Sequence, residues 1–157
     1  ILAELLMKKM NVETKRELME SIVCGCSDHT LKVKEFAPLL FEAARVNDEV
    51  AVDILKKSGK RSANDIIAVI KTLNFSIRET LPIVLLGSLY TRCACDIHIN
   101  AMKEAVEREF PNRTFKYETL LTPPVVGAVY WAMENAGIEI DKQRIANQIN
   151  QNIASYK

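Results

Sequence analysis

The sequence predicts an α/β protein that is rich in helices and carries a small sheet flanked by them. Apolar residues recur at helical spacing through the first 73 residues. The run LPIVLLG at 81–87 then has the length of a strand, and TFKYETL at 114–120 alternates like a second strand. Each strand pattern is followed by a helical one. The order strand, helix, strand, helix predicts a right-handed parallel crossover packed between helices.

Composition bounds the class of protein. A chain of 157 residues is normally one domain, and 48% hydrophobic with 26% charged residues is ordinary for a globular protein. A net charge of +1 attracts neither nucleic acid nor an anionic membrane, so we expect no partner of either kind. No apolar run is long enough to span a bilayer and no signal peptide is visible, which favours a cytoplasmic protein. The chain starts at Ile1 inside helical sequence, so we interpret it as a fragment.

Two local signals mark helices near the start. Thr14, followed three residues later by Glu17, forms a capping box at a helix N-terminus. Helical spacing of apolar residues continues over residues 31–44, where Pro38 interrupts the pattern. We therefore expect a kink or two abutting helices near residue 37.

A long helical pattern covers residues 50–73. Asn47 precedes it and is predicted to cap its positive end. Gly59 lies in the middle, where glycine weakens a helix, and predicts a bend. The run KKSGKR at 56–61 is expected to be a solvated face, too short to bind nucleic acid.

The strand LPIVLLG is continuously apolar, which is typical of a strand covered on both faces. An amphipathic helix with its apolar residues inward is expected over INAMKEAVEREF at 99–110. In the last well-marked helix, Thr122 is the predicted N-cap and Gly137 the stop. There Trp131 is expected to pack in the helix interface, and Gly127 to let the helix approach the strand before Gly87. A closing helix is predicted from Asp141.

The four cysteines form two Cys-x-Cys pairs: Cys24 with Cys26, and Cys93 with Cys95. Four thiolates could bind zinc or an iron–sulfur cluster, but such sites usually show Cys-x-x-Cys spacing with turn residues nearby. Free thiols are therefore expected, with no metal site. His29 and His98 are likewise interpreted as surface or helix-start residues and not as ligands.

Gly87 and Ser88 stand at the carboxyl end of the most apolar strand. Ligands of open α/β sheets bind beyond the carboxyl ends of strands. Glycine lacks a Cβ, so a flat ring or a phosphate could approach the backbone there. A glycine that merely terminates the strand is the alternative.

Four segments together resemble the C-terminal half of one ATPase family. They are APLLFEAARVNDEVAVDIL, LPIVLLGSLYTR, INAMKEAVEREFPNRTFKY and PPVVGAVYWAMENAG, in this order. The family groups N-acetylglucosamine kinases with BadF/BadG/BcrA/BcrD-type ATPases, within the actin/hexokinase/Hsp70 superfamily. The resemblance implies the second domain of the actin-like (ribonuclease H-like) ATPase fold. Residues 1–137 would form the adenosine-side nucleotide-binding domain and residues 138–157 a C-terminal helix.

The resemblance also implies a binding site. Gly87, Ser88 and Leu89 fall on the family's adenosine motif, so adenine or ribose would lie against their backbone. Lys34 and Glu35 would lie near the other side of the purine. Many relatives have glycine at the position of Ser88, and glycine also where this chain has Asn47, which tolerates a left-handed backbone. ATP and Mg²⁺ are the implied cofactors, with phosphate and metal contacts supplied mainly by the missing half.

The function implied is that of the ATP-binding half of a sugar kinase that phosphorylates N-acetylglucosamine or a related amino sugar. The phosphate loops and the catalytic aspartate of relatives are absent, so the chain is not expected to be active alone or to contain a catalytic residue. One alternative is the ATPase half of a benzoyl-CoA or 2-hydroxyacyl-CoA reductase activator. Another is a non-enzymatic interaction module that keeps the fold. A small remnant sheet would also expose an edge, which predicts a homodimer or aggregation.

Overall fold

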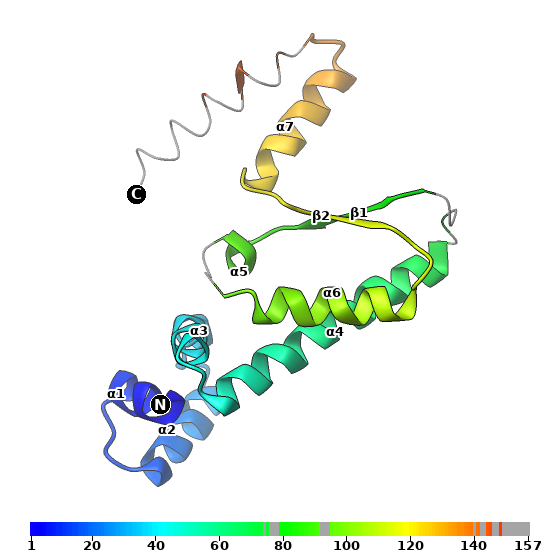
Figure 1. Ribbon diagram of the computed structural model, residues 1–157. Coiled ribbons are helices and arrows are strands. Elements are labelled where there is room, and N and C mark those ends of the chain that lie inside the picture. Colours follow the sequence, from blue (N-terminus) through cyan, green and yellow to red (C-terminus); the bar gives the residue numbers. More distant parts are fainter. Residues whose placement is uncertain are drawn as a thin grey trace. The chain divides into compact units, whose positions relative to one another are not determined.

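The computed structural model describes residues 1–73, 75, 79–91, 95–139, 141, 144, 145 and 148. Figure 1 shows the order of the elements along the chain. These elements are α1 (Leu2–Met10), α2 (Lys15–Ser27), the 3₁₀ turn η1 (Val33–Glu35), α3 (Ala37–Arg45), α4 (Glu49–Leu73), β1 (Leu81–Leu85), α5 (Ser88–Thr91), α6 (Ile97–Glu109), β2 (Phe115–Thr119) and α7 (Pro124–Asn135).

The chain divides into two compact units. The first comprises Ile1–Leu81 and Cys93–Phe115, and the second comprises Pro82–Arg92 and Lys116–Lys157. The division therefore follows spatial packing and not the order of the sequence. The predicted boundary after residue 137 stays a prediction, because most of the predicted closing helix lies outside the described residues.

The two strands form a parallel pair, as the crossover pattern predicts. The Leu81 amide donates to the Thr114 carbonyl (3.0 Å), and the Leu120 amide donates to the Leu85 carbonyl (2.8 Å). Both strands therefore advance in the same direction, and α6 lies between them in the sequence. The chain is rich in helices and has a small parallel sheet, which is compatible with the α/β class, while the actin-like fold stays a prediction.

The capping box at the start of α2 is confirmed. The Glu17 amide donates to Thr14 Oγ1 (3.2 Å), and the Glu17 carboxylate accepts hydrogen bonds from the amides of Glu13 (2.9 Å) and Thr14 (3.2 Å). These bonds, the Glu13 amide first, lower the pKa of the Glu17 carboxyl. The motif satisfies amides that the first helical turn leaves without an intrahelical partner.

The break near residue 37 is also confirmed. The turn η1 ends at Glu35 and α3 begins at Ala37, so two helical segments abut there. Pro38 is the second residue of α3. Its missing N–H costs nothing in the first turn, where amides have no intrahelical acceptor.

The helix α4 is capped by Asp48 and not by Asn47 as predicted. Asp48 Oδ1 accepts a hydrogen bond from the Ala51 amide (3.0 Å), and Oδ2 accepts one from the Leu2 amide (3.0 Å). These two backbone bonds, that of Leu2 first, lower the pKa of Asp48 to about 2. Asn47 instead adopts the left-handed backbone that its side chain tolerates, with φ of 59°.

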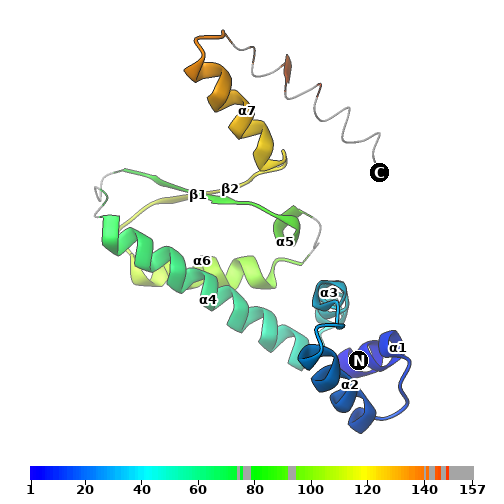
Figure 2. The same cartoon turned by 180° about the vertical axis from the view of Figure 1, so that it is seen from behind.

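The predicted bend at Gly59 is wrong. The helix α4 continues through Gly59 without interruption and packs along α6, as Figures 1 and 2 show from opposite sides. A Cβ at Gly59 would lie 2.3 Å from the His98 carbonyl oxygen and 3.0 Å from Ala101 Cβ. The glycine therefore serves a close approach of two helices, which a single-helix pattern does not reveal.

Small and apolar side chains form the core of the first unit. The buried residues of α4 follow one stripe at nearly regular spacing of four: Ala51, Leu55, Gly59, Ala63 and Ile70. Those of α6 are His98, Ala101, Met102 and Val106. The two helices run in the same direction. Gly59, in the middle of α4, meets His98 at the start of α6, and Lys71, near the end of α4, pairs with Glu109 at the end of α6.

His98 is not a surface residue as predicted. Its side chain is only 2% exposed, and its Nε2 lies 3.5 Å from Ser62 Oγ of α4. Burial lowers the pKa of the imidazole, because desolvation disfavours the charged form. The helical part of the prediction holds, since His98 is the second residue of α6.

The strand β1 is not covered on both faces. Ile83 and Leu85 are buried, whereas Val84 between them is 51% exposed. Period-two alternation of this kind is typical of a sheet with one solvated face. The prediction from the continuous apolar run, a strand buried on both faces, is therefore wrong, because no described element covers the face that carries Val84.

The helix α7 begins at Pro124, preceded by Pro123 in an extended conformation, so Thr122 is not its N-cap. Gly137 ends it as predicted, with φ of 70°. The Ile138 amide donates to the Met133 carbonyl (3.0 Å), which is the bond of a glycine-terminated helix.

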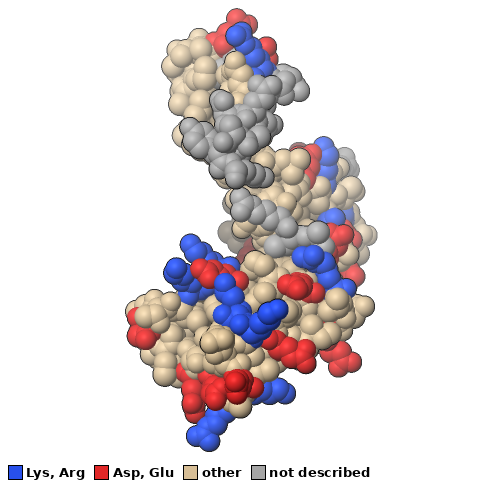
Figure 3. Space-filling model, turned by 90° about the vertical axis from the view of Figure 1, so that its left-hand side faces the viewer, with Lys and Arg blue, Asp and Glu red and all other residues tan. Residues whose placement is uncertain are grey.

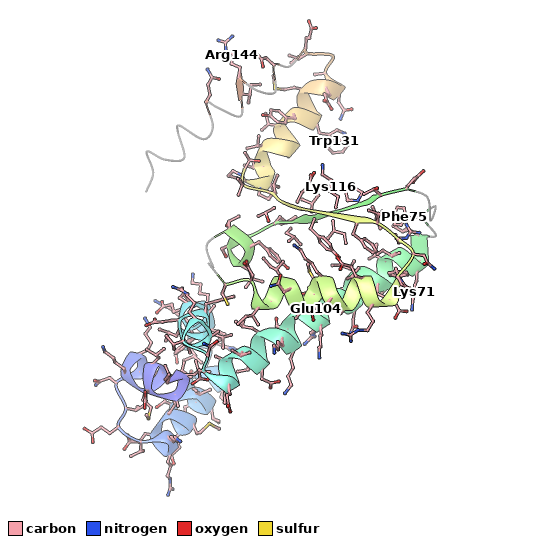
Figure 4. The ribbon with its side chains drawn as sticks, viewed as in Figure 1. Lys71, Phe75, Glu104, Lys116, Trp131 and Arg144 are labelled. Carbon is pink, nitrogen blue, oxygen red and sulfur yellow. The ribbon has the colours of Figure 1, made fainter. Side chains whose placement is uncertain are left out.

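The expected packing of α7 is wrong on two counts. Trp131 is 69% exposed, and Figure 4 shows it projecting from the side of the helix. Nothing lies within 4 Å of a Cβ built at Gly127, so this glycine permits no close approach. Val126 is the buried residue of α7. Across the described chain, no helix combines the length and apolarity needed to cross a bilayer.

Candidate functional site

The predicted adenosine motif forms a sharp turn at the carboxyl end of β1. The strand ends at Leu85, and Gly87 has φ of 106°, a backbone region open essentially to glycine alone. The Gly87 carbonyl accepts hydrogen bonds from the amides of Tyr90 (3.1 Å) and Thr91 (3.2 Å). The turn thus leads directly into α5, which Ser88 begins.

The backbone of this turn is open. No atom lies within 4 Å of a Cβ built at Gly87. Gly87 and Ser88 are exposed and Leu89 is half-buried. The left-handed conformation explains why glycine stands here, and the open space means that a planar group could reach the peptide plane.

Lys34 and Glu35 lie in the turn η1, and both are exposed. A Glu35 carboxylate oxygen lies 3.1 Å from Lys9 Nζ. The hydrogen bond and charge of Lys9, more than the charges of Lys32 and Lys34, lower the pKa of the Glu35 carboxyl. The carboxylate is therefore already engaged by a cation.

The two groups of predicted site residues belong to different compact units. Lys34 and Glu35 are in the first unit and Gly87–Leu89 are in the second. Their predicted places on two sides of one purine therefore stay a prediction.

In the described chain, the cysteines do not come together as the ligands of one metal ion. Cys24 and Cys26 are both exposed on α2, and residues two apart on a helix point to different sides. Gly25 between them is buried, with Leu31 Cβ 3.0 Å from where its own Cβ would be. Cys95 is half-buried and Cys93 lies outside the described residues. Among the described residues, no three side chains of metal-binding type gather.

Charge is mixed over much of the surface. In the face that Figure 3 presents, basic and acidic side chains are interspersed, in keeping with a net charge of +1. One hollow between α4 and α6 is more basic, and sequence reasoning missed it. Its two lysines, Lys56 and Lys60, lie four residues apart on α4, within the run KKSGKR that predicts a solvated face, and its Arg108 lies on α6.

No protein-family model, curated protein or solved structure matches the chain. The resemblance to the N-acetylglucosamine kinase and BadF/BadG/BcrA/BcrD-type family therefore rests on the four segments alone. Nucleotide binding, Mg²⁺ and the sugar substrate stay proposals.

Proposed function

We propose that the chain is the adenosine-binding half of an ATP-dependent kinase for N-acetylglucosamine or a related amino sugar. The observation that supports this most directly is the turn at Gly87. It lies at the carboxyl end of a parallel strand, has φ of 106° and leaves its backbone open. This is where α/β proteins place ligands.

Three neighbouring residues would share the nucleoside. The peptide at Gly87 would lie flat against adenine, which no residue with a Cβ would permit. The Ser88 hydroxyl, which both donates and accepts hydrogen bonds, would serve the ribose. Leu89, half-buried, would supply apolar contact.

The contribution of these residues to phosphoryl transfer is positioning. They would hold the nucleoside so that the terminal phosphate is aimed at the sugar hydroxyl. Phosphate contacts, Mg²⁺ ligands and the catalytic carboxylate would come from a further domain, whose closure excludes water. The 157 residues alone would therefore bind ATP or ADP in the cytoplasm without transferring phosphate.

The test is the affinity of the 157-residue chain for a fluorescent ATP analogue. Gly87→Val should raise the dissociation constant at least about tenfold, because the new side chain would occupy the space of the base. Gly137→Val is the matched control. It also places a side chain at a left-handed glycine in open space, with φ of 70°.

The Gly137→Val control distinguishes the loss of a nucleotide contact from the effect of backbone strain. Both substitutions cost backbone energy, and far-UV circular dichroism checks that each variant is folded. Equal affinity of both variants and the parent chain, or no binding by the parent chain, would contradict the proposal.

An interaction module is the second candidate, and one observation favours it. Trp131 is 69% exposed on α7, together with Val125 and Val129 on the same helix. Val125 and Val129 are one turn apart, and Trp131 points to another side of the helix. Apolar residues exposed on more than one side of a helix favour a partner that covers it. Absence of any nucleotide binding would leave this as the preferred function. No observation on Cys24 or Cys26 favours the reductase activator.

The homodimer expected from the sequence is kept as a proposal. Val84, on the uncovered face of β1, and Leu86, directly after the strand, are each more than half exposed. Burying them against a second copy would remove apolar surface from water. Light scattering should show a mass that rises with concentration, and a constant monomer mass would refute the dimer.

A further inference from the structure

A basic hollow lies between α4 and α6, wholly within the first unit. Its volume is about 390 Å³. This lies within the range of small-molecule sites, roughly 300–1,000 Å³. The residues that line it are Lys56 and Lys60 of α4 and Ile97, Asn100, Ala101, Glu104 and Arg108 of α6.

Close packing of the two helices holds the walls of the hollow in place. Gly59, between the two lysines in sequence, meets the backbone of α6 directly, and Ala101 is buried beneath the hollow. Lys56 and Lys60 are four residues apart and so lie on one side of α4. Glu104, labelled in Figure 4, and Arg108 stand in the same relation on α6. The polar groups therefore project from two rigid helices and not from loops.

The charge of the hollow is unlike that of the whole chain. Three cationic side chains face one carboxylate in it, whereas the chain carries a net charge of only +1. Several other exposed lysines are paired: Lys57 Nζ lies 2.6 Å from an Asp53 carboxylate oxygen, and Lys71 pairs with Glu109. Within the described chain, no ion pair involves the charged side chains that line the hollow.

We propose that this hollow binds a sugar phosphate, that is, a phosphate monoester of a small polyhydroxylated molecule. Lys56, Lys60 and Arg108 would bind the phosphate through charge-assisted hydrogen bonds. Glu104 would accept hydrogen bonds from hydroxyls, and Asn100 would both donate and accept. An isolated phosphate would leave Glu104 as a repulsive neighbour. The proposal uses none of the residues proposed for adenosine, so either proposal can fail without the other.

The first experiment compares three probes by isothermal titration calorimetry of the 157-residue chain at low salt. Glucose 6-phosphate should bind at least about tenfold more tightly than inorganic phosphate, and glucose should not bind. No binding of glucose 6-phosphate at millimolar concentration would overturn the proposal. Equal binding of inorganic phosphate would overturn the assignment to a sugar phosphate.

Variants locate the binding. Lys60→Gln and Arg108→Gln should each weaken glucose 6-phosphate binding about tenfold, since each removes a charge-assisted contact. Lys57→Gln is the matched control, because Lys57 is on the same helix but does not line the hollow. An equal loss in Lys57→Gln would show unspecific attraction and overturn the site.

Glu104→Gln should strengthen the binding of inorganic phosphate, whereas the lysine and arginine variants should weaken the binding of glucose 6-phosphate. It removes the negative charge, so inorganic phosphate should bind more tightly than in the parent chain. The amide oxygen still accepts a hydrogen bond, so glucose 6-phosphate should keep its affinity within about threefold. Unchanged phosphate affinity would contradict the placement of the anion beside Glu104. Far-UV circular dichroism of all four variants confirms that the exposed substitutions leave the helices folded.

Discussion

The helix pair α4–α6 and the helix α7 differ in how much of their apolar surface is buried. In the pair, Met102 is fully buried and Gly59 brings the two backbones together. In α7, a more apolar sequence leaves Trp131 69% exposed and Gly127 beside open space. A helix that is apolar all round is normally buried. Apolar content alone therefore does not predict that a helix is packed. The surface of α4 is buried because the shape of α6 is complementary to it, and α7 has no such neighbour among the described residues.

The largest expected effect contrasts a core residue with an exposed one. Met102→Ala should lower the free energy of unfolding by about 2–5 kcal/mol, because it leaves a cavity in the α4–α6 interface. Trp131→Ala should change it by no more than about 0.5 kcal/mol. Urea unfolding followed by circular dichroism measures both. A large loss in Trp131→Ala would mean that α7 is covered in solution.

The second contrast is between two glycine-to-alanine substitutions whose effects on stability should have opposite signs. Gly59→Ala should destabilise the chain by about 1–3 kcal/mol, because the added Cβ would lie 2.3 Å from the His98 carbonyl oxygen. Gly127→Ala should stabilise α7 by about 0.5–1 kcal/mol, since alanine favours a helix interior and meets nothing there. Thermal unfolding midpoints should move in opposite directions. A shift in the same direction for both would refute the difference in packing.

The smallest effect concerns pH and His98. Its folded-state pKa is lowered by burial, so the unfolded state binds the proton first as pH falls below about 6.5. Stability should therefore decrease from pH 7 toward pH 5. Above pH 7, His98 is neutral in both the folded and the unfolded state, so its titration should leave stability unchanged. His98→Gln should remove this part of the pH dependence, whatever its effect on stability at pH 7. Urea midpoints at several pH values test it, and parallel pH profiles for both chains would contradict it.

Some features could be predicted because they depend on neighbouring residues alone. The reciprocal bonds of Thr14 and Glu17, the break at Pro38 and the end of α7 at Gly137 all arise within one helical turn. The parallel strand pair followed from the order of strand and helix patterns. The candidate turn at Gly87 was also found this way, since its position after an apolar strand is visible in the sequence.

Other features depend on partners distant in sequence. Asp48 and not Asn47 caps α4, because its carboxylate also reaches the Leu2 amide 46 residues earlier. The uncovered face of β1 could not be inferred from an apolar run that allowed two buried faces. The basic hollow was hidden for the same reason: its lysines and its arginine belong to different helices.

The sequence by itself determined where both strands and most of the helices form in this protein, since capping, proline geometry and periodicity act over a few residues. Only the tertiary structure decided which of their faces are buried. Gly59 illustrates the division: its helix propensity predicts a weak point, yet its contact with α6 makes it part of the tightest interface described. The physical reason is that burial depends on the shape of both surfaces, and a single segment of sequence specifies only one of them.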